Sequence, residues 1–336
     1  MKNTIFEDII LLPINLALFG EGNTNTTGSE GLSDEMKTYY SDYLIDMAEP
    51  ELVHDQFGQK QLIPKNGGKT IQFRKYSPLP KLTTPLEEGK TPDGQTLNMS
   101  VLEATVAQYG GYIELSDVLL LTAIDNNLVQ ATKLLGSQAG RTLDTITREV
   151  LVGGTNVQYA EGQVKARNLL VGGGESGNHY LTVNAIRMAV RTLKRMNAPR
   201  KDGGYVAIIH PDCSYDLMND PNWKYPHQYQ DTSNIYEGEI GKIEGVRFVE
   251  TSEAKVFEKA GASSRDVYAT LVLGDDAYGV TDIQGGGLQH IVKQLGSAGT
   301  SDPLNQRATA GWKATKTAVR LVEEYMVRIE TTASAS

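Results

Sequence analysis

The sequence predicts an α+β fold in which helices and strands are interleaved along the chain. Apolar residues recur every three or four positions from Leu128 to Val150, which is the period of one long helix. A short apolar run, Tyr205–His210, predicts a buried strand. Two alternating apolar stretches are separated by a polar segment rich in proline, which predicts a two-stranded ribbon outside the core.

Composition fits a folded protein of one large domain or two ordinary ones. The chain has 336 residues, of which 40% are hydrophobic and 22% charged. The single cysteine, Cys213, excludes an internal disulfide and suits a reducing compartment. No apolar run reaches the roughly 18 residues of a membrane-spanning helix, so we expect no contact with a membrane.

The net charge of −9 is concentrated at the amino terminus. Residues 1–60 hold 11 acidic residues against 3 lysines, a balance of −8, which leaves −1 for the rest of the chain. Sequence-specific nucleic-acid binding needs a basic surface on the domain as a whole, so this composition argues against it. The acidic part is interpreted as an arm.

This arm begins with an apolar stretch, "IILLPINLALF". Acidic residues precede the stretch and Pro13 interrupts it, so it is interpreted as an anchor rather than a signal peptide. A polar linker at 20–34 and a predicted helix from Ser33 to Met47 follow. These residues cannot build a core alone, and we expect the anchor to pack on a neighbouring subunit. The candidate contacts are Ile9, Leu12 and Phe19.

The next region predicts a ribbon between Lys69 and Tyr109. The strands "KTIQF" and "LNMSV" flank a segment with four prolines, which cannot donate to a sheet ladder. Each arm has on the order of 15 residues and would reach roughly 50 Å. Because isolated hairpins are marginal in water, we expect the ribbon to lie on a partner. Candidate contacts at its tip are Glu87, Glu88, Lys90 and Asp93.

Several further elements follow in order. The long helix is predicted from a cap at Asp125 to the "VGG" near 152, about 26 residues at 1.5 Å each. A second helix, Val183–Asn197, has Thr182 as its cap. A short helix follows the strand at 205–210, and shorter strands are predicted at 246–250 and 268–274. The segment 314–331 alternates in a way that fits a strand or a helix, and its β-branched residues favour a strand for at least part of it.

A glycine-rich loop has the spacing of a dinucleotide-binding fingerprint at Gly172, Gly174 and Gly177. Its surroundings argue against an NAD site. The preceding strand is only about four residues long, the helix begins several residues too late, and no acid lies about 20 positions beyond. We therefore expect a loop that joins two domains, with no cofactor.

No other motif predicts catalysis. The five histidines lack the spacing of metal ligands. His210 and Cys213 are close in sequence, but catalytic residues normally come from distant positions, so a turn with a buried thiol is expected. Three arginines at four-residue steps form a basic stripe, read either as a solvated face or as a contact with an acidic surface or packaged nucleic-acid phosphate. They are Arg187, Arg191 and Arg195.

Five stretches in order resemble the major capsid proteins of tailed phages, specifically the coat-protein family of N-four-like phages. They are "GKTIQFRKYSPL…LEEGKTPDGQTL", "VAQYGGYIELSDVLLLT", "QAGRTLDTITREVLVGGT", "GEIGKIEGVRFVET" and "SDPLNQRATAGWKA", and they span about residues 65–330. The resemblance implies the fold shared by tailed-phage and herpesvirus capsids.

That resemblance implies five parts of the chain. They are an N-terminal arm (1–62), an extended loop (63–112), a peripheral domain with the long "spine" helix (113–178), an axial domain (179–305) and a C-terminal return to the peripheral domain (306–336). It also implies partners: further copies in hexamers and pentamers, a portal and a decoration protein. A chain that retains Met1 favours a separate scaffolding protein over a cleaved N-terminal segment.

The function implied is that of a non-enzymatic shell protein. Many copies would enclose double-stranded DNA, with only non-specific contacts to it, in a virion assembled in the host cytoplasm. Two alternatives remain at this stage: an NAD-binding oxidoreductase, and a tail-tube or other virion protein.

Overall fold

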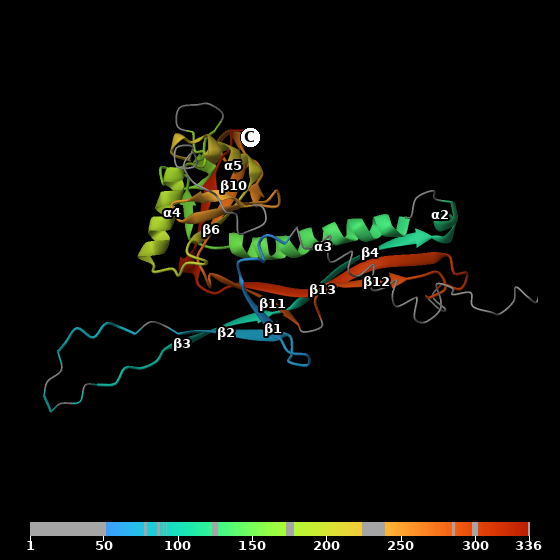
Figure 1. The fold of residues 1–336 in the computed structure, drawn as a ribbon, viewed down its shortest axis with the longest axis horizontal. Coiled ribbons are helices and arrows are strands. Elements are labelled where there is room, and N and C mark those ends of the chain that lie inside the picture. The colour runs from blue at the N-terminus through green and yellow to red at the C-terminus, as the bar shows by residue number, and fades with distance from the viewer. Residues whose placement is uncertain are drawn as a thin grey trace, which may run out of the picture.

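The computed structural model describes residues 52–334 apart from short internal gaps. The described ranges are 52–76, 79–85, 88–89, 91, 93–122, 127–172, 178–223, 239–283, 286–297 and 302–334. Figure 1 shows three parts: a block of strands and helices, a long helix beside long strands, and a loop that reaches away from both. The C-terminus lies at the top of the block.

The long strands form a five-stranded sheet centred on β13 (Arg307–Arg320). β13 pairs antiparallel with β11 (Tyr278–Ile283), β12 (Gln289–Lys293) and β4 (Ala107–Ser116), and the last pairing spans ten residue pairs. β1 (Gln59–Ile63) adds to β11 in parallel. The pairing joins segments that lie far apart in the sequence.

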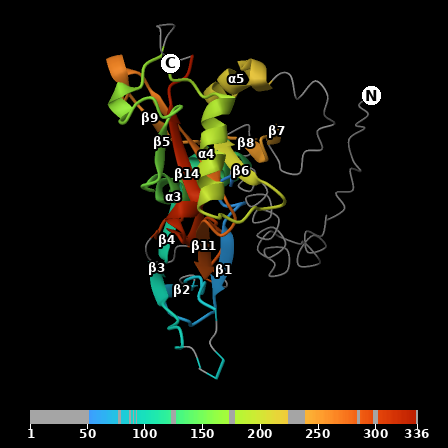
Figure 2. The same cartoon turned by 90° about the vertical axis from the view of Figure 1, so that its left-hand side faces the viewer.

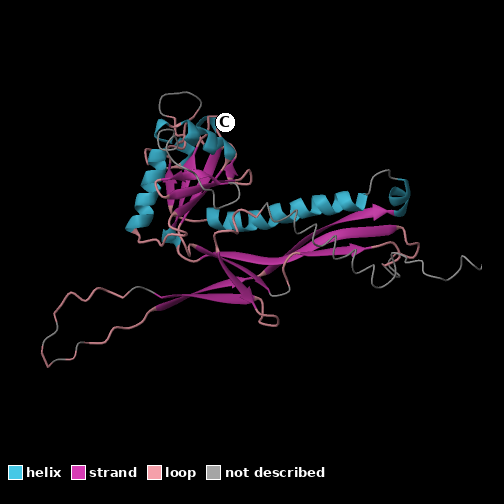
Figure 3. Cartoon of the chain, viewed as in Figure 1, coloured by secondary structure: helices cyan, strands magenta, loops and turns pink. Residues whose placement is uncertain are grey.

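The spine helix α3 (Asn127–Val152) packs along β13 and confirms the predicted length of about 26 residues. Leu135 and Ala139 are buried against Ala310, Trp312 and Ala314 of the strand. Small side chains on β13 let the helix approach closely. A short helix, α2 (Asp117–Thr122), links β4 to α3 at the far end of the sheet, as Figure 3 shows.

The block contains a seven-stranded sheet. Its order is β5 (Val157–Tyr159), β14 (Met326–Thr331), β10 (Val267–Leu273), β6 (Tyr205–Ile209), β8 (Val246–Glu250) and β7 (Glu239–Ile243), with β9 (Val256–Phe257) also on β10. α4 (Val183–Arg195) lies across one face, in front of β14 in Figure 2, and α5 (Pro211–Asn219) lies beside it. Thr182 caps α4 by accepting from the Ala185 N–H, as predicted. Three short 3-10 turns complete the described chain, Arg167–Leu169, Ala262–Ser264 and Glu323–Tyr325.

The ribbon consists of β2 (Thr70–Tyr76) and β3 (Met99–Thr105), paired over seven residues. The predicted arms of about 15 residues are wrong, because the described residues between the two strands form no further pairs. Prolines in this segment lack the N–H groups that a longer ladder needs. The ribbon is therefore a short hairpin stem with a long loop at its end, as seen at the lower left of Figure 1.

The C-terminal segment divides between the two sheets. The predicted strand character is confirmed, since β13 and β14 are both strands on either side of the turn at Glu323–Tyr325. β14 pairs with β10 and β5 in the seven-stranded sheet. β11 and β12 lie within 179–305 in sequence but belong to the five-stranded sheet. Each sheet therefore draws on residues from both halves of the chain.

Candidate assembly surfaces

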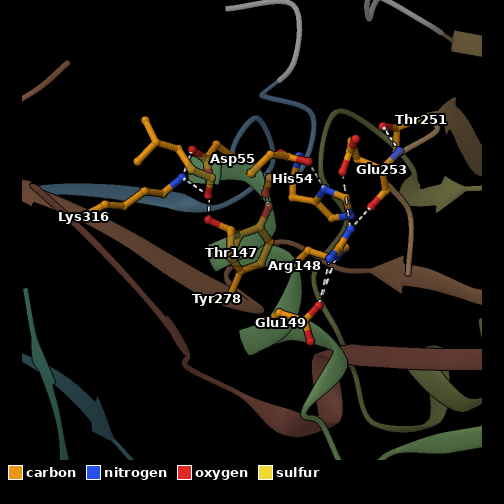
Figure 4. Close-up of polar contacts among 11 residues, drawn as sticks. His54, Asp55, Thr147, Arg148, Glu149, Thr251, Glu253, Tyr278 and Lys316 are labelled. Atoms are coloured by element: carbon orange, nitrogen blue, oxygen red, sulfur yellow. Dashed lines mark hydrogen bonds and ion pairs between the residues drawn. The ribbon is translucent and has the colours of Figure 1, made fainter. Parts of the chain in front are cut away.

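The segment that precedes β1 is fixed to the spine helix by buried polar contacts (Figure 4). The backbone N–H of His54 donates to Asp144 Oδ1 at 2.7 Å, and its ring Nδ1 lies 2.6 Å from Asp144 Oδ2. Both side chains are almost fully buried. The hydroxyl of Tyr278, on β11, donates to the carbonyl of His54. Burial raises the pKa of Tyr278 well above its ordinary value, so this hydroxyl keeps its proton.

Asp55 extends the same contact to the central strand. Its carboxylate accepts from Thr147 Oγ1 at 2.6 Å and pairs with Lys316 of β13. Lys316 Nζ also donates to the carbonyl of Leu143 at 2.9 Å. We call His54, Asp55, Asp144, Thr147 and Lys316 the clasp. It holds the described segment before β1 against the spine helix and β13.

A second polar group links the spine helix to the loop between β8 and β9 of the seven-stranded sheet. Arg148 Nη1 donates to the carbonyl of Glu253 at 2.6 Å, and Lys255 Nζ lies 2.9 Å from Glu149 Oε1. Partial burial alone would raise the pKa of Glu149, but hydrogen bonds from Lys255 and Arg148 outweigh it and lower that pKa below its ordinary value. These contacts and the clasp hold α3 from two sides.

The ribbon exposes most of its apolar side chains. Phe73 and Ala104 are buried at its base, where Phe73 packs against Gly279. Leu97 is 67% exposed, and Met99 and Val101 are 48% and 44% exposed. The register pairs Phe73 with Leu102, so Val101 and Met99 do not share the buried face. The ribbon therefore presents apolar surface that its own chain does not cover.

Two grooves flank the base of the ribbon. One has a volume of about 580 Å³ and lies among β3, the end of β13 and Val150 of the spine helix. The other, of about 270 Å³, is lined by Phe73, Gln59 and Asp276. Leu102 and Leu321 line both. Two open grooves therefore border the base of the ribbon.

The opposite end of the five-stranded sheet is a second exposed apolar area. On α2, Leu121 is 82% and Val118 61% exposed. Leu304, in the turn before β13, is 74% exposed. Exposed apolar side chains therefore occur both on the ribbon and around α2.

The predicted contact residues fall in several places. Glu88 and Asp93 are exposed in the loop beyond the ribbon. Arg187, Arg191 and Arg195 are exposed on α4, and Arg187 Nε lies 2.9 Å from Glu244 Oε1. These two groups lie on different elements and are not brought together. The remaining predicted contacts lie outside the described residues: Ile9, Leu12, Phe19, Glu87 and Lys90.

The glycine loop lacks the setting of a dinucleotide site where it is described. Gly174 and Gly177 lie outside the described residues. The expected short strand before Gly172 is wrong, because the chain there forms the 3-10 turn Arg167–Leu169. Gly172 is buried, and a Cβ on it would come within 2.9 Å of Thr332 Oγ1. The close approach to Thr332 therefore favours glycine at position 172.

His210–Cys213 lie where β6 ends and α5 begins, and the thiol is buried, as expected. His210 caps α5 by accepting from the Asp212 N–H at 3.2 Å. Cys213 is buried, and burial raises the pKa of its thiol to about 12. A thiol with that pKa is a poor nucleophile near neutral pH.

The described residues hold neither a set of metal ligands nor a membrane-spanning helix. No three His, Cys, Asp or Glu side chains gather there as a set of metal ligands. No helix among them has the length and apolar character to cross a membrane. The sequence did not predict the clasp, because its paired residues lie far apart in the chain. His54 and Asp144 are 90 positions apart, and Asp55 and Lys316 are 261 positions apart. The one signal was an aspartate, Asp144, beside the apolar stripe of the spine helix.

The comparisons with known proteins bear on the family and the fold of the chain. The family described as "Phage capsid protein" matches residues 100–327. The capsid of Ralstonia phage GP4 has a TM-score of 0.64 at 14% identity, with 82% of this chain and 87% of that chain covered. The capsid of cyanophage P-SCSP1u gives a TM-score of 0.60 at 14% identity, with 83% and 87% covered. Comparison with curated protein sequences gives no match.

The matched region covers more than half of the chain and includes the spine helix and most strands of both sheets, while β1 and most of β14 lie outside it. The chain therefore belongs to the phage capsid protein family, and its fold is that of tailed-phage capsids. A third structure, the capsid of cyanophage Pam1, gives a TM-score of 0.56 at 19% identity, with 80% of this chain and 86% of that chain covered. Neither the oxidoreductase nor the tail-tube alternative is supported by these comparisons.

Proposed function

We propose that this chain is the major capsid protein of a tailed phage and assembles with further copies of itself, as hexamers and pentamers, into an icosahedral shell around double-stranded DNA. The observation that carries the proposal is the family match over residues 100–327, a region that includes the exposed β3 strand and the exposed end at α2. A protein with two apolar ends and a packed middle is suited to repeated contacts with copies of itself.

The two sheets suggest how the chain is divided in a shell. We assign the five-stranded sheet with α3 to the peripheral domain and the seven-stranded sheet with α4 and α5 to the axial domain. The ribbon and its loop would be the extended loop, and residues 1–51 the arm. The assignment follows strand pairing in place of the sequence boundaries, because β11, β12 and β14 each pair outside the part predicted for them.

The shell would work by mechanical strength rather than by a chemical reaction. A shell resists internal pressure when many identical contacts share the load, so each can be weak. The function needs no catalytic group. A portal, a scaffolding protein and a decoration protein would complete the particle, and assembly would take place in the host cytoplasm. Contacts with packaged DNA would be non-specific, since the net charge is −9.

Electron microscopy of particles formed by the purified chain tests the proposal. Closed shells of uniform diameter, with five- and six-fold clusters of subunits, are the expected result. Cylinders would show a tail-tube protein instead. A chain that remains monomeric at every concentration, with and without a crowding agent, would also contradict the proposal.

A further inference from the structure

The exposed face of α4 carries basic side chains that the described body does not neutralise. Arg187, Arg191 and Arg195 lie at four-residue steps, with Lys194 beside them, and all four are exposed. Steps of four residues place side chains on one side of a helix. Arg187 pairs with Glu244 at 2.9 Å. The other three make no ion pair with any described residue.

The chain carries its negative charge elsewhere. Residues 1–51 hold 10 acidic residues against 2 lysines, a balance of −8 out of a total of −9. The other 285 residues are close to neutral, at −1. The exposed basic face of α4 and the strongly acidic arm therefore have complementary charges. Each copy supplies one basic face and one arm, so the two are equal in number in any assembly.

The order of the acids in the arm also matches a helical face. In the helix that the sequence predicts from Ser33 to Met47, Glu35, Asp42 and Asp46 are separated by seven and four residues. Those steps return to the same side of an α-helix. The tyrosines and methionines of the segment occupy a neighbouring side. A helix that packs its apolar side on one surface therefore keeps its acidic side for a second contact.

We propose that the acidic side of residues 33–47 docks on the basic face of α4 in a second copy. The inference rests on the proposed self-assembly and names one contact within it. A second copy is favoured by the direction in which the chain leaves the body. Lys201, just beyond α4, donates to the carbonyl of Phe57, whereas Leu52 packs against the spine helix and β13. From Phe57 toward the amino terminus, the chain therefore leads away from α4 of its own copy.

Packaged nucleic acid fits the basic face less well than the arm does. Phosphate binding draws on many cations together, and the basic face of α4 offers three unpaired ones, Arg191, Lys194 and Arg195, on a protein whose net charge is −9. Overall negative charge repels a polyanion, while a segment of the protein itself is already at high local concentration in an assembly.

A charge exchange tests the contact. One variant combines Arg191→Glu with Arg195→Glu, a second combines Glu35→Lys, Asp42→Lys and Asp46→Lys, and a third carries all five changes. The yield of sedimenting shells should fall roughly tenfold in each of the first two, because like charges then meet. The third should recover most of the loss. Arg191→Lys with Arg195→Lys is the matched control and should assemble normally.

A cysteine cross-link tests which copy supplies the arm. Chains carrying Asp42→Cys and chains carrying Arg195→Cys are mixed, assembled and oxidised; the native Cys213 is buried. A covalent dimer supports the proposal. A third chain carries both Asp42→Cys and Arg195→Cys. If a disulfide forms only in this chain, and the cross-linked product migrates as a monomer, the second-copy assignment is wrong.

The remaining outcomes are also decisive. If the arginine variant loses packaged DNA while the arm variant assembles normally, the face binds DNA and the proposal is wrong. Equal shell yields for all variants would also reject it. The unaltered chain is the reference: if it forms no shells, the proposed function itself fails, whereas normal shells that are insensitive to every exchange reject only this contact.

Discussion

The spine region and the ribbon are both built on antiparallel strand pairs, but they differ in what covers those pairs. In the spine region, β4 and β13 pair over ten residues, and α3 buries Ala310, Trp312 and Ala314 beneath it. In the ribbon, β2 and β3 pair over seven residues, and Met99 and Val101 remain about half exposed. The β4–β13 pair is covered by a helix of the same chain, and no described helix covers the β2–β3 pair in that way.

This difference separates folding from assembly. Burial of apolar area and of satisfied polar groups stabilises the spine region in a single subunit. The ribbon gains little from its own chain, so its residues are available for a partner. Variants in the spine region should therefore change the free energy of unfolding, and variants in the ribbon should change the yield or stability of shells.

The largest effect is expected in the clasp. Asp55→Ala leaves Lys316 buried without its carboxylate, since the Lys316 side chain is only 7% exposed. Removing one partner of a buried ion pair costs about 3–5 kcal/mol, so the free energy of unfolding should fall by that amount. Glu244→Ala removes the exposed pair with Arg187 and is the matched control, at about 0–1 kcal/mol. Denaturant titration measures both, and equal small losses would show that the clasp is not buried.

Two adjacent leucines on the spine helix provide the next test. Leu135 is 2% exposed and Leu134 is 66% exposed, so the same substitution samples both sides of one helix. Leu135→Ala should lower the free energy of unfolding by about 2–5 kcal/mol. Leu134→Ala should change it by less than about 0.5 kcal/mol. If the two losses were similar, the buried face would be assigned wrongly. Ile146 is half-buried in the same cluster, so Ile146→Ala should fall between them.

Shortening the ribbon's loop should affect assembly and leave folding intact. Replacing Thr83–Thr96 with an Asn-Gly turn keeps the β2–β3 pairs, all of which lie outside that range. The free energy of unfolding of the subunit should change by less than about 0.5 kcal/mol, while shells fail to form or break at lower temperature. Calorimetry of the subunit and electron microscopy of the particles measure the two properties. Normal shells from the shortened chain would remove the loop from the assembly contacts.

The smallest effect is expected from single charges at that loop. Glu88 and Asp93 are exposed, and each should contribute about 0–1 kcal/mol to any contact. Glu88→Ala should leave shell yield within about twofold of the original, and the double variant with Asp93→Ala should lower it further. Sedimentation of assembled particles measures the yield. An abrupt loss from either single change would mean that the residue is buried at a specific contact.

Local patterns were enough to predict some elements and not others. The spine helix and α4 were predicted because their periodicity and caps are local signals, as at Thr182. The split of β13 and β14 between two sheets was not, because strand pairing is decided by distant residues. Ribbon length was overestimated, since alternation of apolar residues indicates a strand but not how far it is paired.

The sequence also predicted some of the candidate surface residues and not others. Exposure of Arg187, Arg191 and Arg195 follows from their positions opposite the apolar side of α4. The exposed leucines of α2 and the clasp were not foreseen, because a single sequence does not say which apolar or charged residues meet across the fold. Asp144 could equally have been solvated from its position in the sequence.

Hydrogen exchange in free subunits and in assembled shells tests the separation of folding from assembly most directly. The account predicts that amides of β2 and β3 exchange much more slowly in shells than in subunits, while those of α3 and β13 are protected alike in both. Similar exchange of the ribbon in the two states would contradict it, because the ribbon would then have no partner in the shell.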